Sequence, residues 1–83
     1  MGTLMHDTGR VLVHLFKADE KGEREVETMA RILEMGRNVI RYHLDQLKEA
    51  GLADIESGKY IYGPIYWGVT AEGRKHVMEG KLI

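Results

Sequence analysis

The residues with the clearest chemical capacity lie between positions 37 and 42 of this 83-residue chain, namely Arg37, Asn38, Arg41 and Tyr42. Arginine can bond the O6 and N7 atoms of guanine with two hydrogen bonds, and asparagine can do the same with adenine. If Arg37 and Asn38 open a helix, the free N–H groups of its first turn also favour a phosphate. An ordinary solvated helix face is the alternative interpretation of the same side chains.

Metal chemistry would have to come from His76, which lies four residues after Glu72 and three before Glu79 on a predicted helix. Histidine and carboxylate side chains on one helix face can bind zinc. The same spacing gives ordinary charge pairing on a solvated helix, which we favour. We therefore expect no metal and no cofactor, and we expect His43 to be partly buried rather than to be a ligand.

Residues for catalysis are scarce in the sequence. The one serine, Ser57, lies in a predicted turn and lacks the Gly-x-Ser-x-Gly context of an activated nucleophile. The sequence also contains no glycine-rich loop with a lysine and a Ser or Thr to hold a phosphate. A domain of this size has little room to enclose a substrate pocket of ~300 Å³ or more. The sequence therefore does not predict an enzyme.

Composition and charge restrict the fold and its partners. The chain contains no cysteine, which excludes disulfides and cysteine-bound zinc, and its length predicts a single domain over residues 1–83. No stretch approaches the roughly 20 apolar residues of a membrane span, and the first residues do not resemble a secretory signal. We therefore expect a cytoplasmic protein. The net charge of −1 gives no general attraction for nucleic acid, so such binding must come from a local surface.

The hydrophobic pattern predicts helices in the first half of the chain. Apolar residues at helical spacing indicate helices over about residues 9–18 and 27–34, with a brief strand at 24–26 between them. A third helix is predicted over residues 38–50, ending before Gly51, which suits the left-handed position after a helix. Its apolar stripe consists of Ile40, Leu44 and Leu47.

After Gly51 the pattern changes to short strands. Two runs within residues 52–69 predict a hairpin, and the second is rich in β-branched and aromatic residues. Thr70 suits the N-cap of a last helix over about residues 71–79. The predicted fold class is α+β, with three helices, a hairpin and a C-terminal helix. The later residues expected to pack on the helices or in the core are Ile65, Trp67, Val69, Val77 and Met78.

Residues 28–44 have the anatomy of a helix-turn-helix, whose second helix can enter a major groove about 12 Å wide. Together with Leu44-Asp-Gln-Leu-Lys-Glu-Ala-Gly-Leu52 and Val69-Thr-Ala-Glu-Gly73, this segment resembles winged-helix DNA-binding regulators of the ArsR, MarR and PadR type. The three stretches cover about residues 26–78. Two positions depart from the family pattern, because Glu34 replaces a common glycine and Gly36 replaces a Ser or Thr N-cap.

The resemblance implies a winged helix that binds double-stranded DNA as a homodimeric transcriptional regulator. It implies a helix-turn-helix over about residues 27–50, with helix 38–50 in the major groove, and a wing over about 52–69 against an adjacent backbone or minor groove. Asp45 opposes this assignment, because a carboxylate near the groove repels phosphate. The positions implied to contact DNA are Arg37, Asn38, Arg41, Tyr42, Gln46 and, in the wing, Lys59.

A second interpretation is a winged-helix module that binds another protein in a larger assembly. The near-neutral charge and three hairpin tyrosines favour it, since an exposed aromatic cluster can bind a protein partner. The same tyrosines can instead pack across the strands. These tyrosines are Tyr60, Tyr62 and Tyr66. Cancellation of the arginine charges by Glu34, Asp45 and Glu49 would strengthen the protein-binding interpretation.

Overall fold

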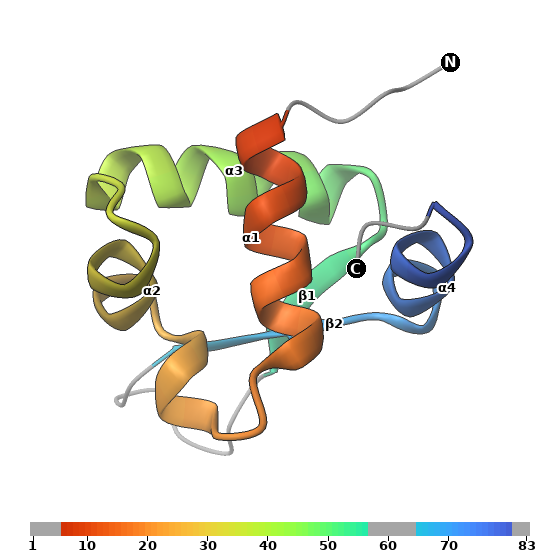
Figure 1. The fold of residues 1–83 in the computed structure, drawn as a ribbon, viewed down its shortest axis with the longest axis horizontal. Helices are drawn as coiled ribbons and strands as arrows, with labels where there is room; N and C mark the ends of the chain where they lie inside the picture. Colours follow the sequence, from red (N-terminus) through yellow and green to blue (C-terminus); the bar gives the residue numbers. More distant parts are fainter. Residues whose placement is uncertain (1–5, 57–64, 81–83) are drawn as a thin grey trace.

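The computed structural model describes residues 6–56 and 65–80. Figure 1 shows α1 crossing the middle of α3, with α2 and α4 at opposite ends of the molecule. The predicted α+β winged-helix class is confirmed. In chain order the elements are α1 (His6–Lys17), a 3₁₀ turn η1 (Lys21–Arg24), α2 (Val26–Leu33), α3 (Arg37–Glu49), β1 (Ala53–Glu56), β2 (Tyr66–Val69) and α4 (Ala71–Glu79).

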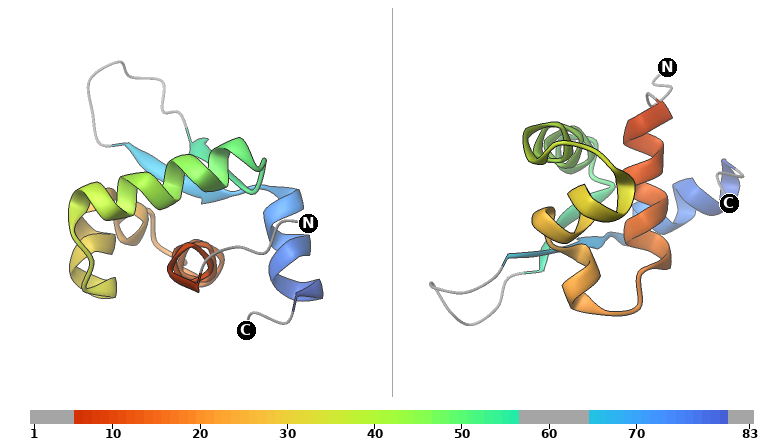
Figure 2. Two further views of the ribbon diagram at one scale, coloured as in Figure 1. Left: turned by 90° about the horizontal axis from the view of Figure 1, so that it is seen from above. Right: turned by 60° about the vertical axis from the view of Figure 1, so that its left-hand side comes forward.

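The core lies where α1 crosses α3. The view from above in Figure 2 shows α1 end-on, with α2 and α4 on either side of it. Val77 is fully buried, whereas Met78, which was also expected in the core, is 63% exposed. Gly73 and Val77, four residues apart, form the buried side of α4, and Met78 points about 100° away from Val77 around the helix axis. The buried cluster consists of Val11, Leu12, Leu15, Met29, Ile40, Leu44, Leu47, Ala53, Trp67 and Val77.

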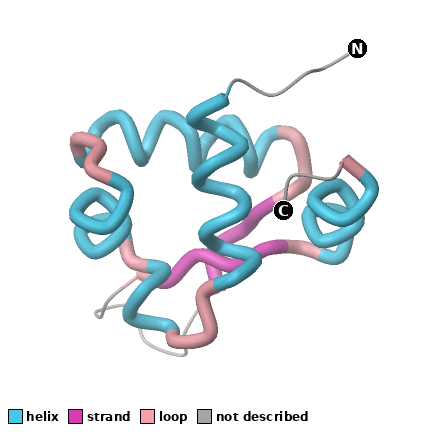
Figure 3. Tube along the Cα trace, viewed as in Figure 1, coloured by secondary structure: helices cyan, strands magenta, loops and turns pink. Residues whose placement is uncertain are grey.

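The strands β1 and β2 are the magenta segments of Figure 3. They pair antiparallel, with Ile55 opposite Trp67. Gly51, whose φ is 78°, turns the chain from α3 into β1 in a conformation that glycine adopts without steric cost. Trp67 is buried against the helices, as expected. Ile65 was expected on the same packed face but is 57% exposed, because it precedes Tyr66, where the strand pairing starts.

Arg24 lies where the sequence predicted a brief strand at residues 24–26, and that prediction is wrong. The segment contains the end of η1 and the start of α2. The Arg24 guanidinium donates to the carbonyl oxygens of Trp67 and Ala18 at 2.9 Å and to Glu56 Oε1 at 3.0 Å. A side chain therefore supplies the hydrogen bond to β2 that a neighbouring strand would have supplied, and it ties the hairpin to the end of α1.

Helix α4 begins at Thr70, whose hydroxyl oxygen accepts a hydrogen bond from the Gly73 N–H at 2.9 Å. The same hydroxyl donates to the Gly51 carbonyl at 2.7 Å, so the predicted N-cap also joins α4 to the end of α3. A Cβ at Gly73 would overlap the carbonyl oxygen of Leu52. The absence of a side chain at this position allows α4 to pack directly on the backbone between α3 and β1.

None of the helices in residues 6–56 and 65–80 is long and apolar enough to cross a membrane.

Candidate nucleic-acid interface

The turn between α2 and α3 depends on the backbone of Glu34 and Gly36. Glu34 adopts the left-handed conformation, with φ 55° and ψ 47°, at a position where glycine is the usual residue. The Met35 N–H donates to the Ala30 carbonyl at 3.0 Å and closes the end of α2. Gly36 is extended and its carbonyl accepts from the Ile40 N–H at 2.9 Å. Helix α3 therefore starts at Arg37, one residue earlier than the sequence predicted.

The inner face of α3 determines which of its residues point outward. Four of its side chains are buried, including His43, which is 4% exposed. The His43 Nδ1 atom lies 2.8 Å from Thr8 Oγ1 of α1. This contact satisfies both polar groups inside the core and helps to fix the rotation of α3 against α1. His43 is therefore a core residue, more completely buried than the partial burial that the sequence predicted. The buried residues are Ile40, His43, Leu44 and Leu47.

The exposed side of α3 carries all five of the DNA-contact candidates predicted on this helix. Arg37 and Asn38 occupy its first two positions, where backbone N–H groups have no partner within the helix. The residues that the sequence predicted as DNA contacts on this helix therefore all lie on its exposed side. The exposed candidates are Arg37, Asn38, Arg41, Tyr42 and Gln46.

The remaining candidates belong to the hairpin. Lys59, Tyr60 and Tyr62 lie outside the described residues. Tyr66, at the start of β2, is half-buried. The described part of the hairpin therefore tests neither the wing contact with DNA nor the aromatic cluster.

Arg37 forms an ion pair with Glu27 of α2, with Nη1 and Oε1 2.7 Å apart. The hydrogen bond and the negative charge of Glu27 raise the pKa of Arg37 above its usual value. Both side chains remain more than half exposed, at 61% and 65%. An ion pair in contact with water is weak, so a phosphate can replace Glu27 as the partner of Arg37.

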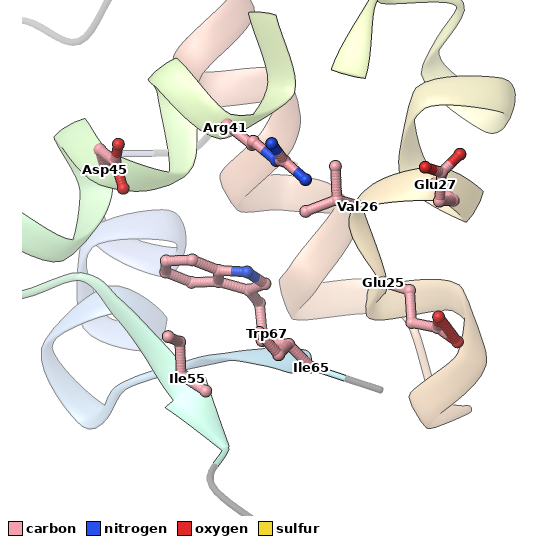
Figure 4. Close-up of a pocket in the computed structure, with 8 residues that line it drawn as sticks. All are labelled: Glu25, Val26, Glu27, Arg41, Asp45, Ile55, Ile65 and Trp67. Carbon is pink, nitrogen blue, oxygen red and sulfur yellow. The ribbon is translucent and has the colours of Figure 1, made fainter. Parts of the chain in front are cut away.

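Arg41 lies at the edge of an open groove of about 450 Å³ between the start of α2, α3 and the hairpin. Figure 4 shows its side chain extending from α3 toward Val26, above Trp67. Among the described residues, no carboxylate lies within ion-pair distance of Arg41. The groove thus combines an apolar floor with three carboxylates and one guanidinium. Its lining residues are Glu25, Val26, Glu27, Arg41, Asp45, Ile55, Ile65 and Trp67.

Sequence reasoning missed Glu27 and Val39. Glu27 was not among the candidate residues that the sequence predicted, and its partner Arg37 lies ten residues away in the next helix. Helical side-chain neighbours lie three or four residues apart, so no local pattern could reveal this pair. Val39 is 45% exposed although it lies in the first turn of α3. Val39 does not belong to the apolar stripe of Ile40, Leu44 and Leu47, and this was the one sign in the sequence that its side chain would be exposed.

The candidate metal ligands on α4 do not form a site in the described structure. His76 is half-buried, whereas Glu72 and Glu79 are exposed. Within residues 6–56 and 65–80, no three His, Cys, Asp or Glu side chains are placed to hold a metal ion.

Comparison with known proteins gives a family and two similar structures. Staphylococcus aureus MepR, solved as a complex with DNA, matches 95% of this chain with a TM-score of 0.76 and 18% identity. This chain spans 63% of the length of that MepR chain.

A second similar structure is that of a candidate DNA-binding protein from Ralstonia eutropha JMP134, with a TM-score of 0.71 and 26% identity. The match covers 93% of this chain and 96% of the other. No curated protein matches the sequence. The model of the family described as "Helix-turn-helix domain" matches residues 4–56, which is more than half of the chain. Together with the geometry of α2, the turn and α3, this match shows that the chain belongs to the helix-turn-helix domain family.

Proposed function

We propose that this protein is a transcriptional regulator that binds double-stranded DNA. The observation that carries the proposal is the exposed first half of α3, where Arg37, Asn38 and Arg41 project from the second helix of a helix-turn-helix. The structural likeness to MepR, which was solved with DNA, and to a candidate DNA-binding protein supports it. The residues of this surface bind bases and phosphates, and we assign the protein no catalytic reaction.

In the proposed complex, α3 enters the major groove with its N-terminal end toward the base edges. Asn38 is suited to adenine and the two arginines to guanine or to phosphates. Tyr42 and Gln46 extend the contact along the helix, and Lys59 contributes from the wing. Because Glu27 holds Arg37 in the free protein, binding exchanges one anionic partner of that guanidinium for another.

The test is fluorescence anisotropy with labelled random duplex at low salt, comparing the wild type with Arg37→Ala/Arg41→Ala. We expect the double variant to bind at least tenfold more weakly, because two charged contacts are lost. The matched control is Arg74→Ala/Lys75→Ala, which removes the same charge from exposed positions of α4 and should stay within about threefold of the wild type.

Equal binding by the wild type and Arg37→Ala/Arg41→Ala would contradict the assignment of these two side chains. Equal losses in both double variants would show a general charge effect rather than a groove contact. Absence of binding by the wild type, both to random duplex and to any sequence selected from it, would contradict DNA binding itself.

We further propose that the protein binds DNA as a homodimer. Helix-turn-helix dimers contact two half-sites about one helical turn, ~34–36 Å, apart. Light scattering coupled to size-exclusion chromatography, with and without duplex, should give two protomers per DNA molecule. A complex with one protomer on a saturated duplex would contradict the dimer.

A protein-binding module is the second candidate, and the groove beside the hairpin favours it. Ile55 and Ile65 are both exposed there, and three carboxylates line the same groove, a combination that repels phosphate and suits a protein surface. The anisotropy experiment separates the two candidates, because this second function needs no affinity for duplex.

A further inference from the structure

An uncharged, partly apolar area on α3 consists of Val39, which has no role in the DNA contacts assigned above, and Tyr42, which has one. Val39 is 45% exposed and Tyr42 is 51% exposed, and their spacing of three residues makes them neighbours on the helix. Val39 lies two positions from both Arg37 and Arg41, which places it on nearly the opposite side of α3 from the two arginines. Bases rather than phosphates are the fitting partners of such an area.

Folding does not explain a valine at this position. Val39 belongs neither to the buried cluster nor to the partly buried residues that pack against it. A β-branched residue also has a lower helix propensity than alanine, so an exposed valine gives α3 no local advantage. The side chain therefore has apolar surface available for a partner.

The position of Val39 indicates the partner. It is the third residue of α3, within the segment that in a helix-turn-helix contacts base edges. The C5-methyl group of thymine is the apolar group that base pairs present in the major groove. The χ1 angle of valine is strongly restricted in a helix, so its two methyl groups are already oriented before binding.

We infer that Val39 determines sequence specificity by packing against a thymine C5-methyl group, with the Tyr42 ring beside it. The thymine belongs to a base pair next to the one that Asn38 contacts, so each half-site contains an adenine close to this thymine. DNA is the favoured occupant because the area adjoins Asn38 on the same exposed turn. The inference rests on the proposed function and adds a base-specific contact to it.

The test starts by selecting preferred duplexes from a random pool with the full-length wild type. Each thymine of the selected site is then replaced singly by uracil, which removes only the methyl group. We expect one replacement per half-site to weaken wild-type binding roughly fourfold, the effect of burying one methyl group. Val39→Ala should bind the thymine duplex several-fold more weakly and show no further loss with uracil at that position.

The matched control is Ile32→Ala, which shortens a similarly exposed apolar side chain, 49% exposed, on α2. It should keep the wild-type sensitivity to uracil. Melting curves should show that both variants are at least as stable as the wild type, since alanine is the better helix former.

The outcomes separate the inference from the function on which it rests. Failure to enrich any duplex would count against DNA binding. Enrichment without sensitivity to uracil at any thymine, or full uracil sensitivity in Val39→Ala, would overturn the thymine contact and leave DNA binding intact. Enrichment without sensitivity to uracil is also the result expected if Val39 and Tyr42 contact a protein partner instead of DNA.

Discussion

At the scale of single residues, Glu27 limits the charge that Arg37 presents to DNA. The pair raises the pKa of Arg37 above its usual value. A group whose pKa is higher in the folded than in the unfolded protein stabilises the fold fully at any pH below its unfolded-state pKa. This stabilisation is lost only as the pH rises through the folded-state pKa. Arg37 therefore stays charged and paired around neutrality. Changes of pH in that range should not release it through its own titration.

Replacing Glu27 by glutamine should raise the affinity for random duplex about threefold at low salt, because one carboxylate next to the proposed phosphate contact is lost. The measurement is anisotropy at several salt concentrations. The matched control is Glu72→Gln on α4, an exposed position with the same charge change. An equal gain in both variants would show that net charge, rather than the pair with Arg37, controls the affinity.

Glu34 carries backbone strain in the turn of the helix-turn-helix. Its φ of 55° lies in the left-handed region, which costs a residue with a Cβ more than it costs glycine. Glu34→Gly should therefore raise the free energy of unfolding by up to about 1 kcal/mol in urea denaturation. Glu34→Ala removes the same charge and keeps the Cβ, so a similar gain in that variant would exclude the backbone explanation.

At the scale of elements, Gly73 sets how closely α4 approaches the junction of α3 and β1. A Cβ there would overlap the Leu52 carbonyl and press on a methyl group of Val69. Gly73→Ala should lower the free energy of unfolding by about 1–3 kcal/mol, the usual cost of overpacking. Gly9→Ala is the matched helical control, because its Cβ meets no described atom within 4 Å, and it should stabilise α1 by about 0.5–1 kcal/mol.

Arg24 joins the hairpin to the end of α1 through three hydrogen bonds. Its side chain is only 12% exposed, whereas that of its partner Glu56 is 42% exposed. Arg24→Met should destabilise the fold by about 2–3 kcal/mol, since part-buried carbonyls lose a charged donor. Glu56→Gln weakens the ion pair alone and should cost less than about 1 kcal/mol. Equal costs in thermal unfolding would place the stabilisation in the ion pair instead of in the carbonyl contacts.

At the scale of the whole molecule, the net charge of −1 limits non-specific attraction to DNA. The proposed surface offers few cations, and Arg37 starts from a pair with Glu27. We expect log K against log salt concentration to fall with a slope of about −2 to −4 per protomer, from two to four neutralised phosphates. A slope steeper than about −6 in an anisotropy titration would show a larger basic surface than the one proposed.

The sequence alone determined the elements that position the candidate site. Within residues 6–56 and 65–80, apolar spacing predicted α2 and α3, and the Thr70 cap predicted α4, each within one residue of its observed bounds. The first helix, expected from about Gly9, starts at His6. Thr70 was predicted as the N-cap of the last helix, and in the structure it caps α4. These features depend on residues within one or two helical turns of each other, which a sequence pattern records directly. The outward direction of Arg37, Asn38 and Arg41 follows from the same periodicity.

The tertiary structure decided what those side chains meet. No local sequence pattern predicted the pairing of Arg37 with Glu27 or the hydrogen bond of the Arg24 side chain to β2. The same is true of the exposure of Ile65 and Met78. Each depends on segments that meet only when α1, α2, α3 and the hairpin pack together. Periodicity shows which side of an element faces outward, whereas the charge and shape of a surface arise from neighbours that are distant in the chain.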